Sequence, residues 1–436
     1  MSIRLLLSLA LSVLALAALP AGASATDWVP GEVIVGYEDG ATAAATAGAA
    51  EAAGTVTEQP LPGDSEQLAI EDGDSVRETI AELETDPNVA YAVPNWRAHA
   101  AATRPNDPAA SLQWNLFDTW GINLVEAWTL AEGLGAPLGQ GAVVAVLDSG
   151  VAYETRGRFR KAPDLRHSTF VKPFDFIDND RHPNDAYGHG THVAGTIAQW
   201  TNNRVGTAGI APRAKVMPLR VLDSFGSGDS AAISRAIRYA ARHHADVINL
   251  SLEFPAEVRA REIPDVLSAI RYANRRGSLI VAAAGNQEDV RVAYPARAEH
   301  VVSVGATTDT GCQAWYSNSG EDLDISAPGG GIDAANTDSV WDSQHCDTQE
   351  FGRPIVQQTF VHEARVRRFG FPRNYEGTSM AAPHVSAVAA LLIASHRIGR
   401  NPSPAQVEAH LEATSRHTDR PDRYGAGIVD AAAALR

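Results

Sequence analysis

The sequence of 436 residues predicts an α/β domain whose mostly parallel sheet is flanked by helices on both faces, preceded by a smaller α+β unit. The larger domain is indicated by continuous apolar runs rich in β-branched residues, which alternate with helical patterns after residue 110. The smaller unit is indicated by charge. Residues 26–100 carry 15 Asp and Glu against only Arg77 and Arg97, whereas the rest of the chain is near neutral.

The first 25 residues have the pattern of a signal peptide. Arg4 precedes an apolar run over residues 5–19, and Ala23-Ser24-Ala25 matches the small-x-small rule for cleavage. The alternative, an uncleaved membrane anchor, is disfavoured because that run is too short to span a bilayer comfortably. We therefore expect an exported protein, extracellular or periplasmic, without a membrane span.

Residues 26–103 combine short strand and helix patterns. Alternating polarity predicts strands over 31–37, 67–70 and 89–93. Helical periodicity predicts helices over 41–53 and 75–84. This order is compatible with a ferredoxin-like α+β unit, of a size at which a domain is marginally stable alone. The proline-containing segment 103–108 disfavours helix, so we expect a linker or processing region there and begin the larger domain at residue 104.

Residues 104–436 contain the patterns of the parallel sheet. Apolar runs predict buried strands over 142–147, 216–222, 247–252, 279–284 and 301–306, and helical patterns occupy 189–200, 230–243 and 260–276. Strands that are apolar on both faces and separated by helices are typical of a parallel sheet covered on both sides. Ligand sites in such sheets lie at the carboxyl ends of the strands, so polar residues that follow these runs are candidates for chemistry.

Asp148 directly follows the first buried strand, and His189 begins a helix in the motif G-H-G-T-H-V-A-G-T. Taken alone, Asp148 is also compatible with a helix cap. His189 and His192 suggest a metal pair, but the HExxH spacing is absent and no third ligand stands nearby in the sequence. We expect His192, one turn into the helix, to be a packed structural histidine.

Ser379 lies in the glycine-containing segment G-T-S-M-A-A-P-H, before an apolar helix predicted over 385–395. It is compatible with a simple N-cap, but a helix N-terminus also surrounds the hydroxyl with backbone N–H groups that suit an oxyanion. The pattern is G-x-S-x-A rather than the G-x-S-x-G elbow of α/β-hydrolases. Asn286 ends the strand over 279–284, either as a turn residue or as an amide donor to that oxyanion.

Four segments resemble signatures of the subtilisin-like serine peptidases, in the order found in that family. They are V-A-V-L-D-S-G at Asp148, H-G-T-H-V-A-G-T at His189, A-A-A-G-N at Asn286 and G-T-S-M-A-A-P-H at Ser379. The resemblance extends over residues 105–436 and implies a subtilisin-like fold for them. Residues 26–100 resemble the inhibitory propeptide of the family, which implies a segment that templates folding and occupies the cleft.

The resemblance also implies roles for single residues. Ser379 would attack the scissile carbonyl, His189 would pass its proton to the leaving amine, and Asp148 would orient the imidazole. The backbone N–H of Ser379 and the side chain of Asn286 would bind the oxyanion. The residues implied in substrate binding are Ser251, Leu252, Glu253, Ala283, Gly285 and Ala293.

The chain departs from the family in two places. Glu253 stands where the family usually has glycine, and we expect its carboxylate to favour a basic residue before the cut unless the side chain turns to solvent. The segment over 330–376, which precedes the predicted nucleophile, is longer than in compact family members, and a loop of this length is typically functional or mobile.

Structural calcium is common in the family, and no organic cofactor is expected. The residues that match positions of its tightest calcium site are Asp164, Asn203, Val205 and Thr207. Two side chains and two carbonyls would form an oxygen cage there, although the loop has one extra residue. Cys312 and Cys346 stand in an oxidising export context, so we expect them to form a disulfide, with two free thiols as the alternative.

These observations predict a secreted serine endopeptidase made as an autoprocessed zymogen. We expect a monomer whose partners are protein or peptide substrates and its own propeptide. Basic residues are scattered rather than striped, which argues against a nucleic-acid partner. A catalytically silent, peptide-binding scaffold would require a defective triad, and none is seen. An esterase is disfavoured because Asp, His and Ser follow in that order along the chain.

Overall fold

The structure is a computed structural model that describes residues 28–96, 104–334, 346, 352–362, 365–418 and 420–436. The chain divides into two compact units, the first ending at Ala100 and the second beginning at Ala101. The predicted signal peptide lies outside the described residues.

The N-terminal unit contains β1 (Trp28–Tyr37), α1 (Ala43–Ala52), β2 (Thr55–Leu61), β3 (Ser65–Ile70), α2 (Val76–Leu83) and β4 (Val89–Trp96). Its strands pair antiparallel in the order β2-β3-β1-β4, which is the ferredoxin-like arrangement. The sequence did not predict β2, because most of its side chains are exposed and its apolar alternation is weak. Val33, Val35 and Leu68 are fully buried beneath the two helices and form the centre of its core.

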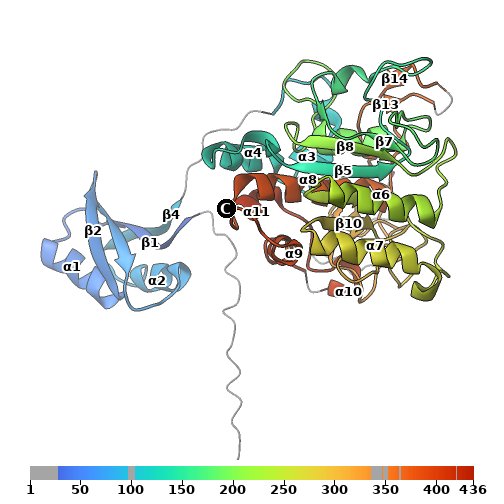
Figure 1. Ribbon diagram of the computed structural model, residues 1–436. Coiled ribbons are helices and arrows are strands. Elements are labelled where there is room, and N and C mark those ends of the chain that lie inside the picture. Colours follow the sequence, from blue (N-terminus) through green and yellow to red (C-terminus); the bar gives the residue numbers. More distant parts are fainter. Residues whose placement is uncertain (1–27, 97–103, 335–345, 347–351, 363–364, 419) are drawn as a thin grey trace, which may run out of the picture. The chain divides into compact units, whose positions relative to one another are not determined.

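The C-terminal unit is built on a parallel sheet, shown in Figure 1. Its strands are β5 (Val143–Asp148), β6 (Thr169–Phe170), β7 (Phe174–Asp175), β8 (Lys215–Arg220), β9 (Val247–Leu250), β10 (Leu279–Ala283), β11 (Val302–Thr307) and β12 (Ile325–Pro328). The order is β12-β11-β10-β9-β5-β8-β6, with β7 also paired to β8. Because the chain passes from β5 to β8 on one side and then to β9 on the other, the topology reverses at β5, and ligand sites lie at such switch points.

Both faces of the sheet are covered by helices, as the sequence predicts. Val144 and Val146 of β5 pack on the side of α5 (His189–Ala198) and α8 (Thr378–Ser395), whereas Ala145 and Leu147 pack on the opposite side. That side is covered by α6 (Ser230–Arg242) and α7 (Pro264–Arg275), which lie side by side in Figure 1. Alternate side chains of one strand therefore belong to two separate hydrophobic cores.

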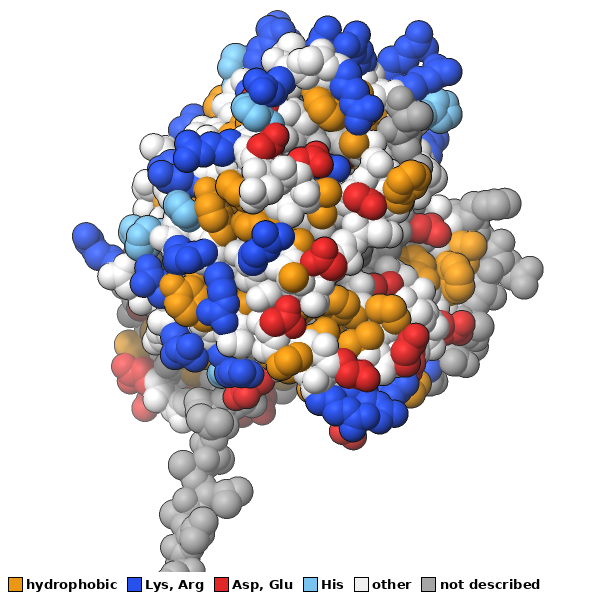
Figure 2. All heavy atoms as spheres, turned by 45° about the vertical axis from the view of Figure 1, so that its right-hand side comes forward, with side chains coloured by type: hydrophobic (Ala, Val, Ile, Leu, Met, Phe, Trp, Pro, Cys, Tyr) orange, Lys and Arg blue, Asp and Glu red, His pale blue; other side chains and the backbone are white. Residues whose placement is uncertain are grey.

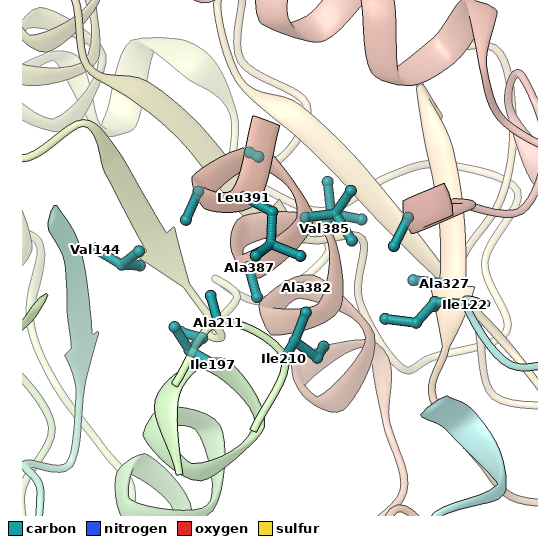
Figure 3. Close-up of a cluster of buried hydrophobic side chains, with 14 of the residues drawn as sticks. Ile122, Val144, Ile197, Ile210, Ala211, Ala327, Ala382, Val385, Ala387 and Leu391 are labelled. Atoms are coloured by element: carbon teal, nitrogen blue, oxygen red, sulfur yellow. The ribbon is translucent and has the colours of Figure 1, made fainter. Parts of the chain in front are cut away.

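Helix α8 is the centre of one core, and Figure 3 shows Ala382, Val385 and Leu391 pointing into the surrounding side chains. Among the described residues, α8 is the one helix long and apolar enough to cross a membrane, but 89% of that window is buried inside the protein. Its composition thus reflects a core position. It begins seven residues before the predicted start, at Thr378, and Pro383 lies inside it, so the predicted nucleophile is in its first turn.

The remaining elements are short or complete the outer layer. They are α3 (Trp114–Phe117), α4 (Leu124–Gly133), α9 (Pro404–Ala413), α10 (Pro421–Tyr424), α11 (Ala431–Leu435), β13 (Thr359–Phe360) and β14 (Phe369–Gly370), with short 3-10 turns at 110–112, 137–139, 163–165 and 260–262. The helix predicted over 260–276 starts at Pro264, because proline fits the first helical turn but not its interior. Strands β13 and β14 form an antiparallel hairpin within the long 330–376 segment.

Candidate active site

A cavity of about 370 Å³ opens at the carboxyl ends of the central strands. His189, Asn286 and Ser379 all line it, although they are far apart in the sequence. Leu222 and Ser251 reach the same cavity just after β8 and β9. The cavity thus lies where the strand order predicts a ligand site, and it brings three of the four predicted catalytic side chains together.

Asp148, the fourth, is the last residue of β5 and is fully buried beside this cavity. Its two carboxylate oxygens lie 2.9 and 3.0 Å from Nδ1 of His189. One of them also accepts a hydrogen bond of 2.7 Å from the backbone N–H of Ser149. Because an ionised carboxylate only accepts, this contact places the imidazole proton on Nδ1 and leaves Nε2 free to act as a base.

The helix that carries His189 approaches β5 very closely. A Cβ atom on Gly190 would lie 2.1 Å from the carbonyl oxygen of Gly150 and 3.0 Å from Cβ of Asp148, so only glycine fits between them. Substitution there would push the imidazole away from Asp148. Gly188, on the other side of His189, has a φ of +109°, a backbone conformation that favours glycine.

Asp185 fixes the start of this helix, and the sequence analysis missed it. Its buried carboxylate accepts hydrogen bonds from the backbone N–H groups of Tyr187, Gly188 and Thr191, at 2.8–2.9 Å, and from the hydroxyl groups of Thr191 and Ser149. The signal available in the sequence was an Asp four residues before His189, at a position where its side chain can bond the first helical N–H groups.

The environment of His189 raises its pKa above the ordinary imidazole value. Burial alone would lower this pKa, because it disfavours the charged ring. The charge and hydrogen bond of Asp148 act in the opposite direction and outweigh burial, and the charge of Asp185 adds to them. His192 shows what burial does without such partners: its pKa is lowered to about 3, and its Nε2 lies 3.0 Å from the carbonyl oxygen of Ile355. It is a packed structural histidine, as expected.

Ser379 is held by a buried polar network that joins α8 to β9. The hydroxyl of Ser251 donates to the carbonyl of Ser379 at 2.8 Å and accepts from the side-chain amide of Asn249. The side-chain oxygen of Asn249 accepts in turn from the hydroxyl of Ser386. The hydroxyl of Ser379 donates to the carbonyl oxygen of Ser251 at 3.2 Å. In this arrangement it therefore faces Ser251, and rotation about its side-chain bond is needed to bring it toward His189.

Asn286 is oriented by the residue before Ser379. Its side-chain oxygen accepts hydrogen bonds from the backbone N–H and the hydroxyl of Thr378, at 2.8 and 3.0 Å. Because the oxygen is engaged there, the amide presents its N–H donors on the other side, where they also approach the carboxylate of Glu253. The first turn of α8 adds backbone N–H groups and the positive end of the helix dipole to the same region, so the arrangement suits a developing negative charge.

The residues predicted to bind substrate lie in two layers. Ser251, Leu252, Glu253 and Ala283 line the cavity. Gly285 and Ala293 are buried, and a Cβ atom on Gly285, whose φ is +114°, would lie 2.6 Å from a carboxylate oxygen of Glu253. Gly285 therefore leaves room for Glu253, so the residue that departs from the family occupies space that the neighbouring glycine provides.

Residues 139–427, which make up more than half of the chain, match the subtilase family, peptidase S8. The chain belongs to the subtilase family. Residues 17–95 match the N-terminal prodomain of fervidolysin, so this subtilase carries a prodomain before its peptidase unit. The predicted family, fold and enzyme class are thereby confirmed.

Individual relatives agree with the family match. A thermophilic serine proteinase of Bacillus sp. strain AK1 is 34% identical over 370 residues, which are 85% of this chain and 79% of the relative. Thermitase of Thermoactinomyces vulgaris is 33% identical over 311 residues, 71% of this chain and 91% of the relative. A solved protease structure from Pseudoalteromonas arctica PAMC 21717 matches with a TM-score of 0.61 and 31% identity, covering 76% of this chain and 99% of that one.

Subtilases commonly bind structural calcium, and the loop predicted to do so holds itself together by hydrogen bonds. The carboxylate of Asp164 accepts from the side-chain amide of Asn203 at 2.7 Å and from the backbone N–H of Thr207 at 2.8 Å. The side-chain oxygen of Asn203 is engaged by the N–H of Val205. Asp164 thus accepts from two N–H groups of this loop, and the calcium site stays a prediction.

Burial raises the pKa of Asp164 to about 7, against the hydrogen bonds that stabilise its charge. Asp107 holds the loop from the other side, accepting from the backbone N–H groups of Asn202 and Asn203 at 2.8 and 2.9 Å. The loop therefore packs as a hydrogen-bonded unit around two carboxylates.

The long 330–376 segment of this subtilase is held to the rest of the peptidase unit in two ways. Cys312, in the turn after β11, forms a disulfide with Cys346, with 5.8 Å between the Cα atoms. Further along, the hydroxyl of Thr359 donates to the carbonyl of Gly188, and the ring of Tyr375 stacks on His192 at 4.2 Å. The segment therefore packs directly against the helix that begins with His189.

Proposed function

We propose that this subtilase is an exported serine endopeptidase, made as an inactive precursor, whose nucleophile, base and orienting carboxylate are Ser379, His189 and Asp148. One observation carries the proposal: a single cavity is lined by Ser379, His189 and the oriented amide of Asn286, while Asp148 holds the imidazole from behind. Membership of the subtilase family and the names of its relatives support peptide bonds as the substrate.

The proposed reaction begins when a peptide lies extended along Ser251 and Leu252. The hydroxyl of Ser379 turns from Ser251 and attacks the carbonyl carbon, and its proton passes to Nε2 of His189. The oxyanion is stabilised by the N–H of Ser379 and the amide of Asn286. Collapse of this intermediate expels the amine, which takes the proton from His189 and leaves an acyl group on Ser379. Water then repeats both steps and releases the acid, which restores the hydroxyl.

The N-terminal unit would act as a folding template and inhibitor that is removed by the enzyme itself. Its match to a prodomain and its acidic composition support this role. The proposed cut lies near residues 100–108, where the proline-containing sequence disfavours regular structure. The signal-peptide pattern over the first 25 residues supports export before processing.

Replacement of Ser379 by alanine tests the proposal. Expression of S379A in an exporting host should accumulate full-length precursor without the signal peptide, whereas the wild-type chain should appear as two fragments. S395A removes another buried serine of the same helix and should process normally, because Ser395 lies at the far end of the helix and bonds only nearby backbone, the carbonyl of Leu392 and the N–H of Arg397. Normal processing of S379A, in a host whose own proteases are inhibited, would contradict self-cleavage at this serine.

We further propose that Glu253 favours Lys or Arg immediately before the cut. Its carboxylate accepts from the backbone N–H of Asn286 at 3.1 Å and from the side chain of Gln287 at 2.5 Å, so it is held toward the cavity. Burial raises its pKa, while these hydrogen bonds oppose that effect. An oriented carboxylate in a partly enclosed pocket attracts a cationic side chain.

A peptide library separates this specificity from the general activity. The wild-type enzyme should prefer Lys or Arg before the cut, and E253Q should lose that preference while still cleaving neutral peptides. E257Q removes an exposed carboxylate from the following loop and serves as the matched control. Cleavage without any preference for Lys or Arg would disprove the role of Glu253 and leave the endopeptidase assignment intact.

A further inference from the structure

A second cavity, of about 670 Å³, lies beside the catalytic cavity and is larger than it. Among its described lining residues four are arginines and none is acidic: Arg158, Arg365, Arg367 and Arg368, with Ala186, Ser224, Phe225 and Val366. We call this cavity the arginine pocket. In Figure 2, Lys and Arg side chains gather at the upper end of the molecule, the end at which Figure 1 labels β13 and β14.

The arginine pocket is built by the long 330–376 segment, which brings three of its arginines. They lie in the hairpin of β13 and β14, where the N–H of Val361 donates to the carbonyl of Arg368 at 3.0 Å. The guanidinium of Arg367 donates to the carbonyl of Arg158 at 2.7 Å and also reaches Gly157. This contact fastens the hairpin to the loop that contributes Arg158. The pocket is therefore a fixed feature of the peptidase unit.

The arginine pocket shares a wall with the catalytic cavity. Ala186 and Phe225 line the arginine pocket, and their neighbours in the sequence, Tyr187 and Gly226, line the catalytic cavity. The two loops that form this wall touch each other, because a Cβ atom on Gly226 would lie 3.1 Å from the ring of Tyr187. A peptide in the cleft advances about 3.4 Å per residue, so a side chain within about three residues of the cut can cross this wall.

The charges of the arginine pocket are not neutralised within the described residues. Arg220 is buried and pairs with Asp175 and Asp178 at 2.8 Å, whereas all four pocket arginines are exposed. None of the four pocket arginines forms such a pair in the described part of the chain, and Glu363 lies outside it. Four neighbouring guanidinium groups create a positive potential that an acidic side chain relieves, and guanidinium matches carboxylate geometry.

We propose that the arginine pocket is a specificity subsite that selects an Asp or Glu side chain of the substrate within three residues of the scissile bond. This inference rests on the proposed endopeptidase function. Phe225, 82% exposed, stands at the rim, where it can cover the aliphatic part of that side chain. The preferred peptide therefore carries a carboxylate at one fixed distance from the cut.

A peptide library with the mature wild-type enzyme tests the subsite. Asp and Glu should be enriched at one position within three residues of the cut. For a peptide pair that differs only by Asp against Asn there, kcat/KM should favour Asp by about 3- to 10-fold at low salt, as expected for partly exposed ion pairs. The ratio should fall when the ionic strength is raised to about 1 M, where the screening length is only about 3 Å.

The variant R365Q/R368Q removes two pocket charges and keeps Arg367, which fastens the hairpin. It should bring the Asp/Asn ratio close to 1 while kcat/KM for the Asn peptide stays within about 2-fold of wild type, since surface changes rarely disturb the fold. R275Q/R276Q removes two exposed charges at the end of α7 and should leave the ratio unchanged.

Three results would overturn the inference. The first is cleavage with no enrichment of Asp or Glu at any nearby position. The second is an acidic preference that persists in R365Q/R368Q, and the third is one that salt does not weaken. Each of these leaves the endopeptidase assignment standing. A failure to cleave any peptide would reject both the function and the subsite.

Discussion

Replacement of Asn286 by alanine removes a donor from the proposed oxyanion site, and the contacts of this side chain indicate how much kcat should fall. Asn286 is oriented by two hydrogen bonds from Thr378, so its amide donor is already in place before substrate binds. Removing one such donor costs about 10²–10³ in kcat, or about 2.7–4 kcal/mol, the value known for the corresponding donor of subtilisin, a related enzyme. KM should change little, because the oxyanion exists only after attack.

A second substitution tests the orientation rather than the donor. T378V removes the hydroxyl, which donates to Asn286 and accepts from the backbone N–H of Gly285, but it keeps the backbone N–H contact to Asn286. The lost contact to Asn286 is worth about 0.5–1.5 kcal/mol, so kcat should fall by about 2- to 12-fold, far less than in N286A, whereas the lost contact to Gly285 should lower stability. Thr378 is therefore a positioning residue, whose loss weakens the site without abolishing it.

The assay is steady-state hydrolysis of one chromogenic peptide by processed enzyme, with kcat and KM measured separately. N401A, an exposed asparagine far along the chain, is the control for loss of an amide and should match wild type. If N286A retains kcat within about 3-fold, or loses activity through KM alone, the amide does not stabilise the transition state in the way proposed.

Three further results are expected. Because Asp148 raises the pKa of His189, kcat/KM should fall as pH drops through a midpoint above the usual imidazole pKa of about 6.5. The variant D148N should move that midpoint to lower pH. A rate that stays flat below about pH 5 would contradict this. Replacing Cys312 and Cys346 by serine opens a cross-link across 34 residues and should lower the free energy of unfolding in denaturant titrations by about 3–4 kcal/mol. If calcium occupies the site predicted around Asp164, EDTA should lower Tm by several degrees; an unchanged Tm would count against that site.

The architecture of the peptidase unit follows closely from the sequence. Continuous apolar strands such as β10 are buried on both faces, and this pattern is unmistakable because it needs only local residues. The strand β2 was missed for the opposite reason, since its side chains are mostly exposed and it is specified by pairing with β3. Helix α8 was predicted too short because the segment before it, with Gly377 and Pro383, has the composition of a turn.

The residues of the site also fall into two groups, those that the sequence indicates and those that only the fold reveals. Asp148, His189 and Ser379 stand out because short motifs surround them, and the parallel sheet explains why distant motifs meet at one edge. Asp185 and Asn249 could not be found by the same reasoning, because their roles depend on hydrogen bonds to partners that only the fold brings close. The arginine pocket is a still stronger case, since residues more than 130 positions apart in the sequence build it.

Covalent labelling can identify the activated serine of this subtilase. An organophosphorus fluoride reacts with a serine hydroxyl only when a neighbouring base activates it, and mass spectrometry locates the adduct on a single peptide. We expect one adduct on Ser379 in the processed wild-type enzyme, with complete loss of proteolysis, and no adduct in H189A. An adduct on a different serine, or full proteolysis after Ser379 is blocked, would contradict it.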